Sequence, residues 1–151
     1  MAQKRSTFIP EDSNPLQEKF ICYIMKDGKK NIARRIFKET MGVLTEKGQK
    51  EPTKTFERAI ENVKPTLEIR PKRIGGAVYQ IPIEVKPGRQ LMLSFRWILD
   101  AARSKKGQPM AKKLADELLN ASNGEGSAIK KKDDTIKMAQ ANKAFAHFAK
   151  Y

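Results

Sequence analysis

The sequence is poor in the side chains that build catalytic centres and metal sites. Its 151 residues include one cysteine, Cys22, and one histidine, His147. A single cysteine cannot form an intrachain disulfide, which favours a reducing compartment, and its apolar neighbours predict that Cys22 is buried. One histidine and one cysteine cannot complete a zinc site of ordinary spacing, and no carboxylate has a histidine beside it that could act as a base. We therefore expect a protein that is not an enzyme and that has no cofactor and no metal.

Long apolar runs are also missing. No stretch approaches the roughly 18 apolar residues that a membrane span needs. The first ten residues contain neither the apolar core of a signal peptide nor the long Arg- and Ser-rich character of a transit peptide. We therefore expect no membrane partner, and we expect the protein to act where it is made, in the cytoplasm or in the interior of an organelle.

Positive charge is what the sequence has in excess. Lys and Arg number 31 against 17 Asp and Glu, which gives a net charge of +14 and an isoelectric point near 10.0. A surface of this kind needs a polyanion to neutralise it, and nucleic acid is the expected partner, with no small-molecule substrate.

Helical periodicity, caps and chain breakers predict a mainly α protein. Residues 1–13 are expected to form a basic irregular tail, and residues 14–151 a single domain of about six helices. The expected helices cover about residues 15–27, 31–47, 52–64, 89–106 and 109–123, and a last helix starts near Asp133 or Asp134 after a linker over residues 124–132.

Between the third and fourth helices the apolar pattern changes to alternation, which predicts a two-stranded hairpin over about residues 66–86. Gly75 and Gly76 can adopt the positive φ angles of a tight turn. Pro71 and Pro82 cannot donate hydrogen bonds to a central sheet, so we expect a protruding, free ribbon.

The hairpin and the following helix hold the densest positive charge. From Arg70 to Lys106 there are nine Lys and Arg residues against two acids. Arg89, Arg96 and Arg103 recur every seven residues and so form a row on the side of the helix away from its apolar face. Such a row can follow a phosphate backbone; alternatively it is a solvated face with Asp100 as a local salt partner.

Further cations flank the starts of the second and last helices, where anions bind readily. Tyr79, near the hairpin tip, is expected either to stack on an unpaired base or to pack across the strands. The candidate RNA-binding residues are Lys4, Arg5, Lys29, Lys30, Arg34, Arg35, Arg70, Lys72, Arg73, Gly75, Gly76, Arg89, Arg96, Arg103, Lys105, Lys106, Lys130, Lys131, Lys132 and Lys143.

Several motifs occur in a fixed order along nearly the whole chain. They are Asp27-Gly28-Lys29-Lys30, Glu61-Asn62-Val63-Lys64-Pro65, Arg73-Ile74-Gly75-Gly76 with Tyr79-Gln80-Ile81-Pro82, Arg96-Trp97-Ile98 with Ala101-Ala102-Arg103, and Ala141-Asn142-Lys143-Ala144-Phe145-Ala146-His147. In this order they resemble the small-subunit ribosomal protein seven family in its bacterial or organellar form.

The resemblance implies a six-helix domain with a β-ribbon arm. It implies a structural, ribonucleoprotein role in translation: primary binding to the 3′ major domain of small-subunit rRNA, nucleation of head assembly, and contacts with neighbouring ribosomal proteins. It also implies that Arg73, Gly75, Gly76 and Tyr79 lie near the exit-site tRNA and the mRNA path.

The chain departs from the family pattern in two places. Arg89-Gln90 stands where the family often has paired arginines, and the basic start is reduced to Lys4-Arg5. The alternative reading is an architectural DNA-binding protein that inserts its β-arm into a groove. Such arms usually carry an apolar wedge, and Gly75-Gly76-Ala77 is a poor one.

Overall fold

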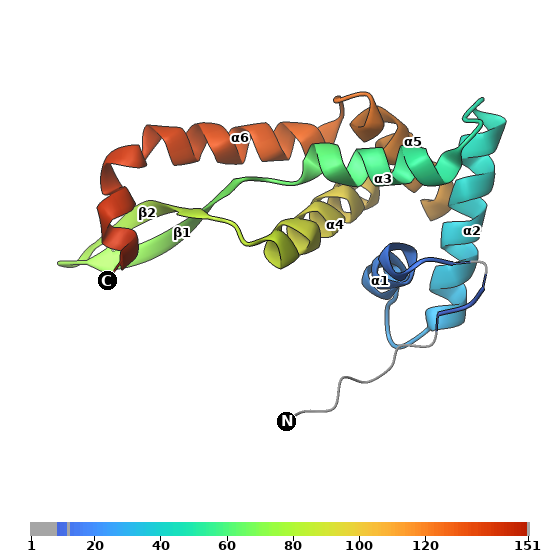
Figure 1. The fold of residues 1–151 in the computed structure, drawn as a ribbon, viewed down its shortest axis with the longest axis horizontal. Coiled ribbons are helices and arrows are strands. Elements are labelled where there is room, and N and C mark those ends of the chain that lie inside the picture. Colours follow the sequence, from blue (N-terminus) through green and yellow to red (C-terminus); the bar gives the residue numbers. More distant parts are fainter. Residues whose placement is uncertain (1–8, 12, 151) are drawn as a thin grey trace.

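In a computed structural model of the chain, residues 9–11 and 13–150 are described, and the expected tail cations Lys4 and Arg5 lie outside them. The prediction of a mainly α fold with a hairpin between the third and fourth helices is confirmed (Figure 1). The elements follow the order α1 (Pro15–Ile24), α2 (Lys30–Glu46), α3 (Pro52–Val63), β1 (Leu67–Ile74), β2 (Ala77–Glu84), α4 (Pro87–Ser104), α5 (Met110–Ser122), α6 (Ser127–Ala141) and the 3₁₀ helix η1 (Lys143–Lys150).

The helices α1 to α5 pack around a cluster of phenylalanines. The ring of Phe20 meets those of Phe56 and Phe95 edge to face, with centroids 5.1 Å apart in both pairs, and all three side chains are fully buried. On α4 the buried side includes Ile98 and Leu99, as the apolar spacing predicted. This phase turns the opposite side of α4, with its arginines, away from the core.

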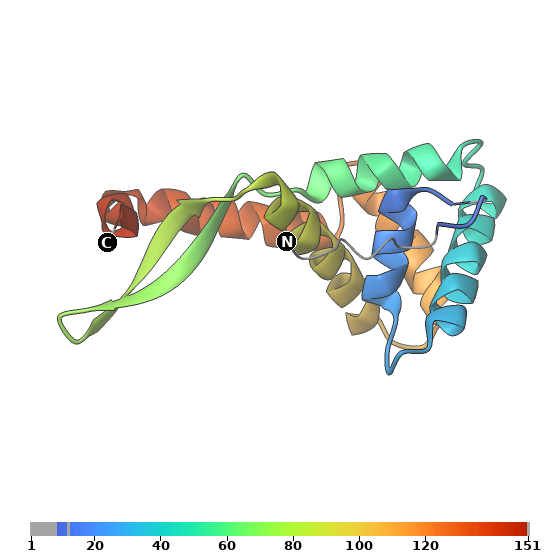
Figure 2. The ribbon, with the colours of Figure 1, turned by 60° about the horizontal axis from the view of Figure 1, so that its bottom comes forward.

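The hairpin is a two-stranded antiparallel ribbon that projects from the helical body (Figures 1 and 2). Gly75 and Gly76 have φ angles of 57° and 88°, a left-handed pair that closes the turn between Ile74 and Ala77. The prediction of the turn is therefore confirmed. The strands are longer than the alternating pattern indicated, because pairing continues through polar residues up to the turn.

The prediction of a free ribbon is wrong in one respect. The ribbon joins no larger sheet among the described residues, but α6 runs along its base and η1 packs against β2. The Tyr79 ring lies 5.1 Å from that of Phe145 and 6.0 Å from that of Phe148. Lys72 Nζ donates a hydrogen bond to the carbonyl oxygen of Phe148 over 3.1 Å. The tip extends beyond this cover in both views (Figures 1 and 2).

The predicted start of the last helix is also wrong. The helix α6 begins at Ser127, so Lys130, Lys131 and Lys132 lie inside it and not in a linker. The buried carboxylate of Glu117 accepts a hydrogen bond from the amide of Ala128 over 2.9 Å and so completes the helix start from another element. A cap supplied from α5 leaves no local signal in the sequence.

Two predictions about the first helix need correction. Helix α1 ends at Ile24, with Met25 as its C-cap, and Gly28 lies in the loop that follows. Cys22 is exposed, not buried, because the buried side of α1 is set by Phe20 and Ile24 and Cys22 falls on the other side.

Candidate nucleic-acid interface

The three arginines of α4 form a row that links the ribbon to the opposite end of the helical body. Arg89 contacts β1 at the base of the ribbon, Arg96 is exposed in the middle, and Arg103 reaches the end of α1. Seven helical residues advance the chain by about 10 Å, which sets the spacing of the row. Asp100 is exposed and, in the part of the chain that the structure describes, forms no ion pair with them. Arg96 and Arg103 are thus free of carboxylate partners among the described residues, whereas Arg89 has one in Glu68.

A buried carboxylate holds the ribbon end of this row. Glu68, only 7% exposed, accepts from Arg70 Nε through one oxygen and from Arg89 Nε through the other, both over 3.1 Å. One negative charge serves two positive charges, so the cluster keeps a net positive charge. Arg70 keeps 62% of its side-chain surface exposed.

A second buried carboxylate, Glu18, holds two cations at the start of α2. Glu18 lies 2.9 Å from Arg34 Nη2 and 3.3 Å from Lys30 Nζ, and its side chain is 3% exposed. Burial alone raises the pKa of this carboxyl, but the hydrogen bonds and charges of Arg34 and Lys30 outweigh it and leave the pKa below the ordinary value. These cations, which oppose the helix dipole, are therefore partly neutralised from within.

Three other candidate cations have partners within the protein. Lys105 Nζ lies 2.9 Å from the second oxygen of Glu117, an ion pair without hydrogen-bond geometry. Lys132 Nζ donates to the carbonyl oxygen of Asn62 at the end of α3, over 2.6 Å. Arg35 pairs with Glu39 on the exposed surface at 3.9 Å, a contact that contributes little.

The remaining candidates are exposed and unpaired with any carboxylate among residues 9–11 and 13–150. This set comprises Lys29, Arg73, Arg96, Lys106, Lys130, Lys131 and Lys143. Arg73 and the two glycines stand at the uncovered tip. Tyr79 is half-buried against Phe145 and Phe148, so its ring is not freely available as a stacking surface.

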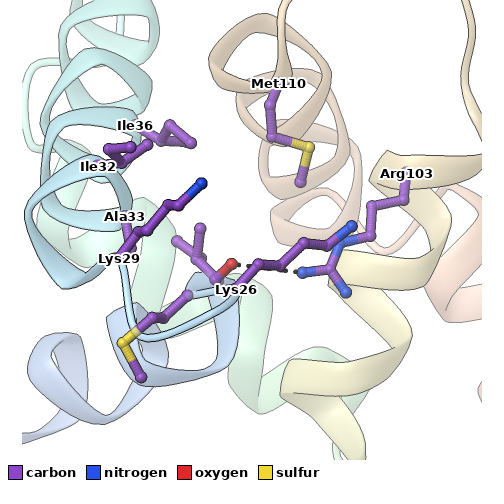
Figure 3. Close-up of a pocket in the computed structure, with 9 residues that line it drawn as sticks. Lys26, Lys29, Ile32, Ala33, Ile36, Arg103 and Met110 are labelled. Atoms are coloured by element: carbon purple, nitrogen blue, oxygen red, sulfur yellow. Dashed lines mark hydrogen bonds between the residues drawn. The ribbon is translucent and has the colours of Figure 1, made fainter.

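The sequence reasoning missed a groove at the other end of the arginine row. The groove lies between the end of α1, the first half of α2, the end of α4 and the start of α5, with a volume of about 290 Å³ (Figure 3). Ile32 and Ile36 have the helical spacing that is typical of a core-facing side, so this spacing alone does not indicate that they line a groove on the surface.

Within the described ranges no group of three or more His, Cys, Asp and Glu side chains could hold a metal ion. None of the helices described is both long and apolar enough to cross a lipid bilayer.

Comparison with known proteins agrees with this picture. The family model of ribosomal protein S7p/S5e matches residues 2–143. The chain is 52% identical over 143 residues to the small ribosomal subunit protein uS7 of Thermosipho melanesiensis, covering 93% of this chain and 92% of that protein. It is 51% identical over 150 residues to the protein of the same name from Thermotoga maritima, covering 97% and 96%. The identity to the Fervidobacterium nodosum protein is 55% over 133 residues, covering 88% and 86%.

Proposed function

Because this chain belongs to the ribosomal protein S7p/S5e family, we propose that it is a structural component of the small ribosomal subunit and binds rRNA directly. It acts on the ribosome, in the cytoplasm or in an organelle, beside other small-subunit proteins. The observation that carries the RNA-binding part is the row of Arg89, Arg96 and Arg103, which turns away from the core and joins the ribbon to the helical body.

The target of this surface is the 3′ major domain of the small-subunit rRNA, where binding nucleates assembly of the head. Double-helical RNA is recognised mainly through its shape, phosphates and 2′-hydroxyl groups. Exposed cations spread over a ribbon and several helices suit that mode better than a single helix that reads base edges.

The experiment is a binding titration of the full chain against a transcript of the 3′ major domain. The logarithm of the affinity should fall linearly with the logarithm of salt concentration, by roughly 0.7–0.9 per phosphate contact. Arg96→Gln should lower that slope by about one contact, whereas Arg58→Gln, which removes an exposed arginine of α3 outside the row, should not. Affinity that is unchanged up to half-molar salt would refute the proposal.

Competition with duplex DNA tests the alternative reading. An architectural DNA-binding protein would bind duplex DNA as tightly as the transcript. The tip, Gly75-Gly76, lacks the apolar wedge of such proteins, although Val78 beside it is 63% exposed. A preference for the transcript of at least about a thousandfold is expected if the rRNA proposal is correct, which is the lower end of the range known for specific over non-specific binding.

The arm tip is proposed to lie near the exit-site tRNA and the mRNA path. Its support is that the ribbon tip extends beyond the C-terminal cover (Figure 2), and that Gly75 and Gly76 form the turn at this tip with the exposed Arg73 close to it in the strand pairing. Small subunits that carry Arg73→Gln should assemble normally and hold exit-site tRNA more weakly. Normal tRNA retention together with defective assembly would place the tip against rRNA instead.

A further inference from the structure

Three helix ends near the start of α6 are completed by residues of other helices. The last carbonyl groups and the first amides of a helix lack partners within that helix. Asn62 Nδ2, near the end of α3, donates to the carbonyl oxygens of Ala121 and Ser122 at the end of α5, over 2.9 and 3.1 Å. Lys132 Nζ of α6 donates in turn to the carbonyl oxygen of Asn62 over 2.6 Å, and Glu117 of α5 accepts from the first turn of α6. Hydrogen bonds therefore join the ends of α3, α5 and α6 in one junction.

None of these three helix ends, which the structure describes in full, has a charge of its own that could serve instead. The last turns of α3 and α5 contain no Lys or Arg, and the first turn of α6 contains no Asp or Glu. Cations stabilise the C-terminus of a helix and anions its N-terminus. The ammonium of Lys132 supplies this charge to α3, and the carboxylate of Glu117 supplies it to α6. The junction is therefore specific in its polar partners.

Apolar packing alone defines the direction of α6 poorly. Within α6, which is described over its whole length, Ile129 is the only large apolar side chain that is buried. The other buried residues are Ala128, Thr135 and Ala139. Burial of apolar surface is non-directional, whereas a hydrogen bond needs a defined geometry. The hydrogen bonds of the junction therefore set the direction in which α6 leaves the helical body.

The direction of α6 affects the ribbon. The helix runs along the base of the ribbon, and η1, which follows it, packs against β2 (Figure 1). A helix of 15 residues is about 22 Å long, so a tilt of about 10° at its start moves its far end by about 4 Å. A change at the junction therefore moves the elements that cover the ribbon.

We propose that Asn62 and Lys132 are positioning residues, which set the direction of α6 and so hold the ribbon arm at a fixed angle to the helical body. The inference rests on the proposed function where it concerns RNA. Exposed cations of the ribbon, such as Arg73, and of the body, such as Arg96, contact one RNA together only at a suitable angle. A fixed angle lowers the entropy cost of binding with both parts at once. In this role the ammonium of Lys132 acts through the arm and not on a phosphate.

The test measures the angle in the free protein. Cys22, the only cysteine of the chain and exposed on α1, takes one spin label. Val78→Cys, at a ribbon position that is 63% exposed, takes the other. Double electron–electron resonance then gives the distribution of distances between the body and the arm. Lys132→Met, which keeps the side-chain stem, and Asn62→Leu should each shift or broaden this distribution by about 4 Å or more. Should Asn62→Leu fail to fold, Lys132→Met carries the test alone.

Two control variants separate positioning from a general loss of stability. Lys131→Met changes the neighbouring residue of α6, which is exposed and has no carboxylate partner among the described residues, and should leave the distribution unchanged. Lys132→Arg keeps a donor for the carbonyl oxygen of Asn62 and should give the distribution of the unaltered chain. A variant that is merely less stable would have a lower Tm and an unchanged distribution.

RNA binding supplies the second measurement. With the 3′ major domain transcript, Lys132→Met should bind about tenfold more weakly at an unchanged salt slope, and Lys132→Arg should bind like the unaltered chain. A slope lowered by about one contact would place the ammonium on a phosphate and overturn the inference. Equal distance distributions for Lys132→Met and the unaltered chain would overturn it as well, and so would an altered distribution with unchanged affinity. Failure of the unaltered chain to bind the transcript would instead refute the proposed function, and the distance measurement, made without RNA, would still decide the positioning.

Discussion

Replacement of Glu68 by glutamine should weaken RNA binding even though it makes the protein more positive. The two Glu68 oxygens hold Arg70 and Arg89 over 3.1 Å each, across the junction between the ribbon and α4. Glutamine is nearly the same size, but an amide NH2 group, which donates and does not accept, replaces the oxygen that holds one of the two arginines. That guanidinium then loses its fixed position.

The expected loss of stability is moderate. A hydrogen bond to a charged group contributes about 1.5–3 kcal/mol when buried, but surface ion pairs contribute about 0–1 kcal/mol. The Arg70 side chain is 62% exposed and that of Arg89 is 39% exposed. We therefore expect the loss in free energy of unfolding to lie nearer to the values for surface ion pairs than to those for buried hydrogen bonds. About 1–2 kcal/mol corresponds to a fall in Tm of about 2–8 °C for a chain of this length.

The direction in which the RNA affinity changes shows whether Glu68 acts by positioning the two arginines or only through its negative charge. Immobilising a long side chain on binding costs about 0.5–1.5 kcal/mol, so freeing these arginines should reduce affinity by about 1 kcal/mol, roughly fivefold. Glu84→Gln changes the net charge equally at an exposed site of β2 and should bind slightly more tightly than the unaltered chain. Titrations of both variants at the same salt concentration decide the matter. If Glu68→Gln binds as tightly as Glu84→Gln, the positioning role is refuted.

Three further outcomes are expected. The pKa of Glu18 is lower in the fold than the ordinary 4.5, so the Glu18 carboxylate contributes its full stabilisation above pH 4.5 and loses it as the pH falls through the folded-state pKa. Thermal unfolding of Glu18→Gln should therefore lack this part of the dependence of stability on acid pH. An acid profile equal to that of the unaltered chain would contradict this prediction. Phe148→Ala should speed hydrogen exchange of the ribbon amides by about tenfold without affecting α4, whereas uniform exchange across the chain would indicate general destabilisation. Gly126→Ala should lower the free energy of unfolding by about 2–3 kcal/mol, because its Cβ would lie 2.9 Å from buried Glu117 Oε1 at a φ of 98°; Gly124→Ala, with a φ of 80° and open space around it, should cost about 1 kcal/mol, and equal losses would rule out the steric contact.

The helical body and the ribbon could be predicted because their signals are local. Asn14 caps α1 by accepting from the amide of Gln17 over 2.8 Å, and an Asn before Pro15 is a local signal of a helix start. The buried phase of α4 follows from the spacing of Phe95, Ile98 and Leu99. The ribbon turn follows from paired glycines, which alone accept both left-handed conformations at low cost.

The remaining features depend on residues that are distant in sequence. The start of α6 relies on a carboxylate of α5, and the ribbon cover relies on aromatic residues that follow three further helices. At the candidate interface, the positions of the cations could be predicted and their internal partners could not. Glu18 and Arg34 are 16 residues apart, and Glu68 and Arg89 are 21 residues apart. A sequence pattern does not show which cations such a carboxylate will hold.

The C-terminal cover of the ribbon imposes an order in time on the arm. During synthesis both strands emerge from the tunnel before α4, α5 and α6, and the segment that carries Phe145 and Phe148 comes only after them. In a nascent chain, therefore, Tyr79 is not yet covered by Phe145 and Phe148, and Lys72 does not yet have its hydrogen bond to Phe148. The arm reaches its final packing only after the C-terminal segment that contacts β2 has been synthesised.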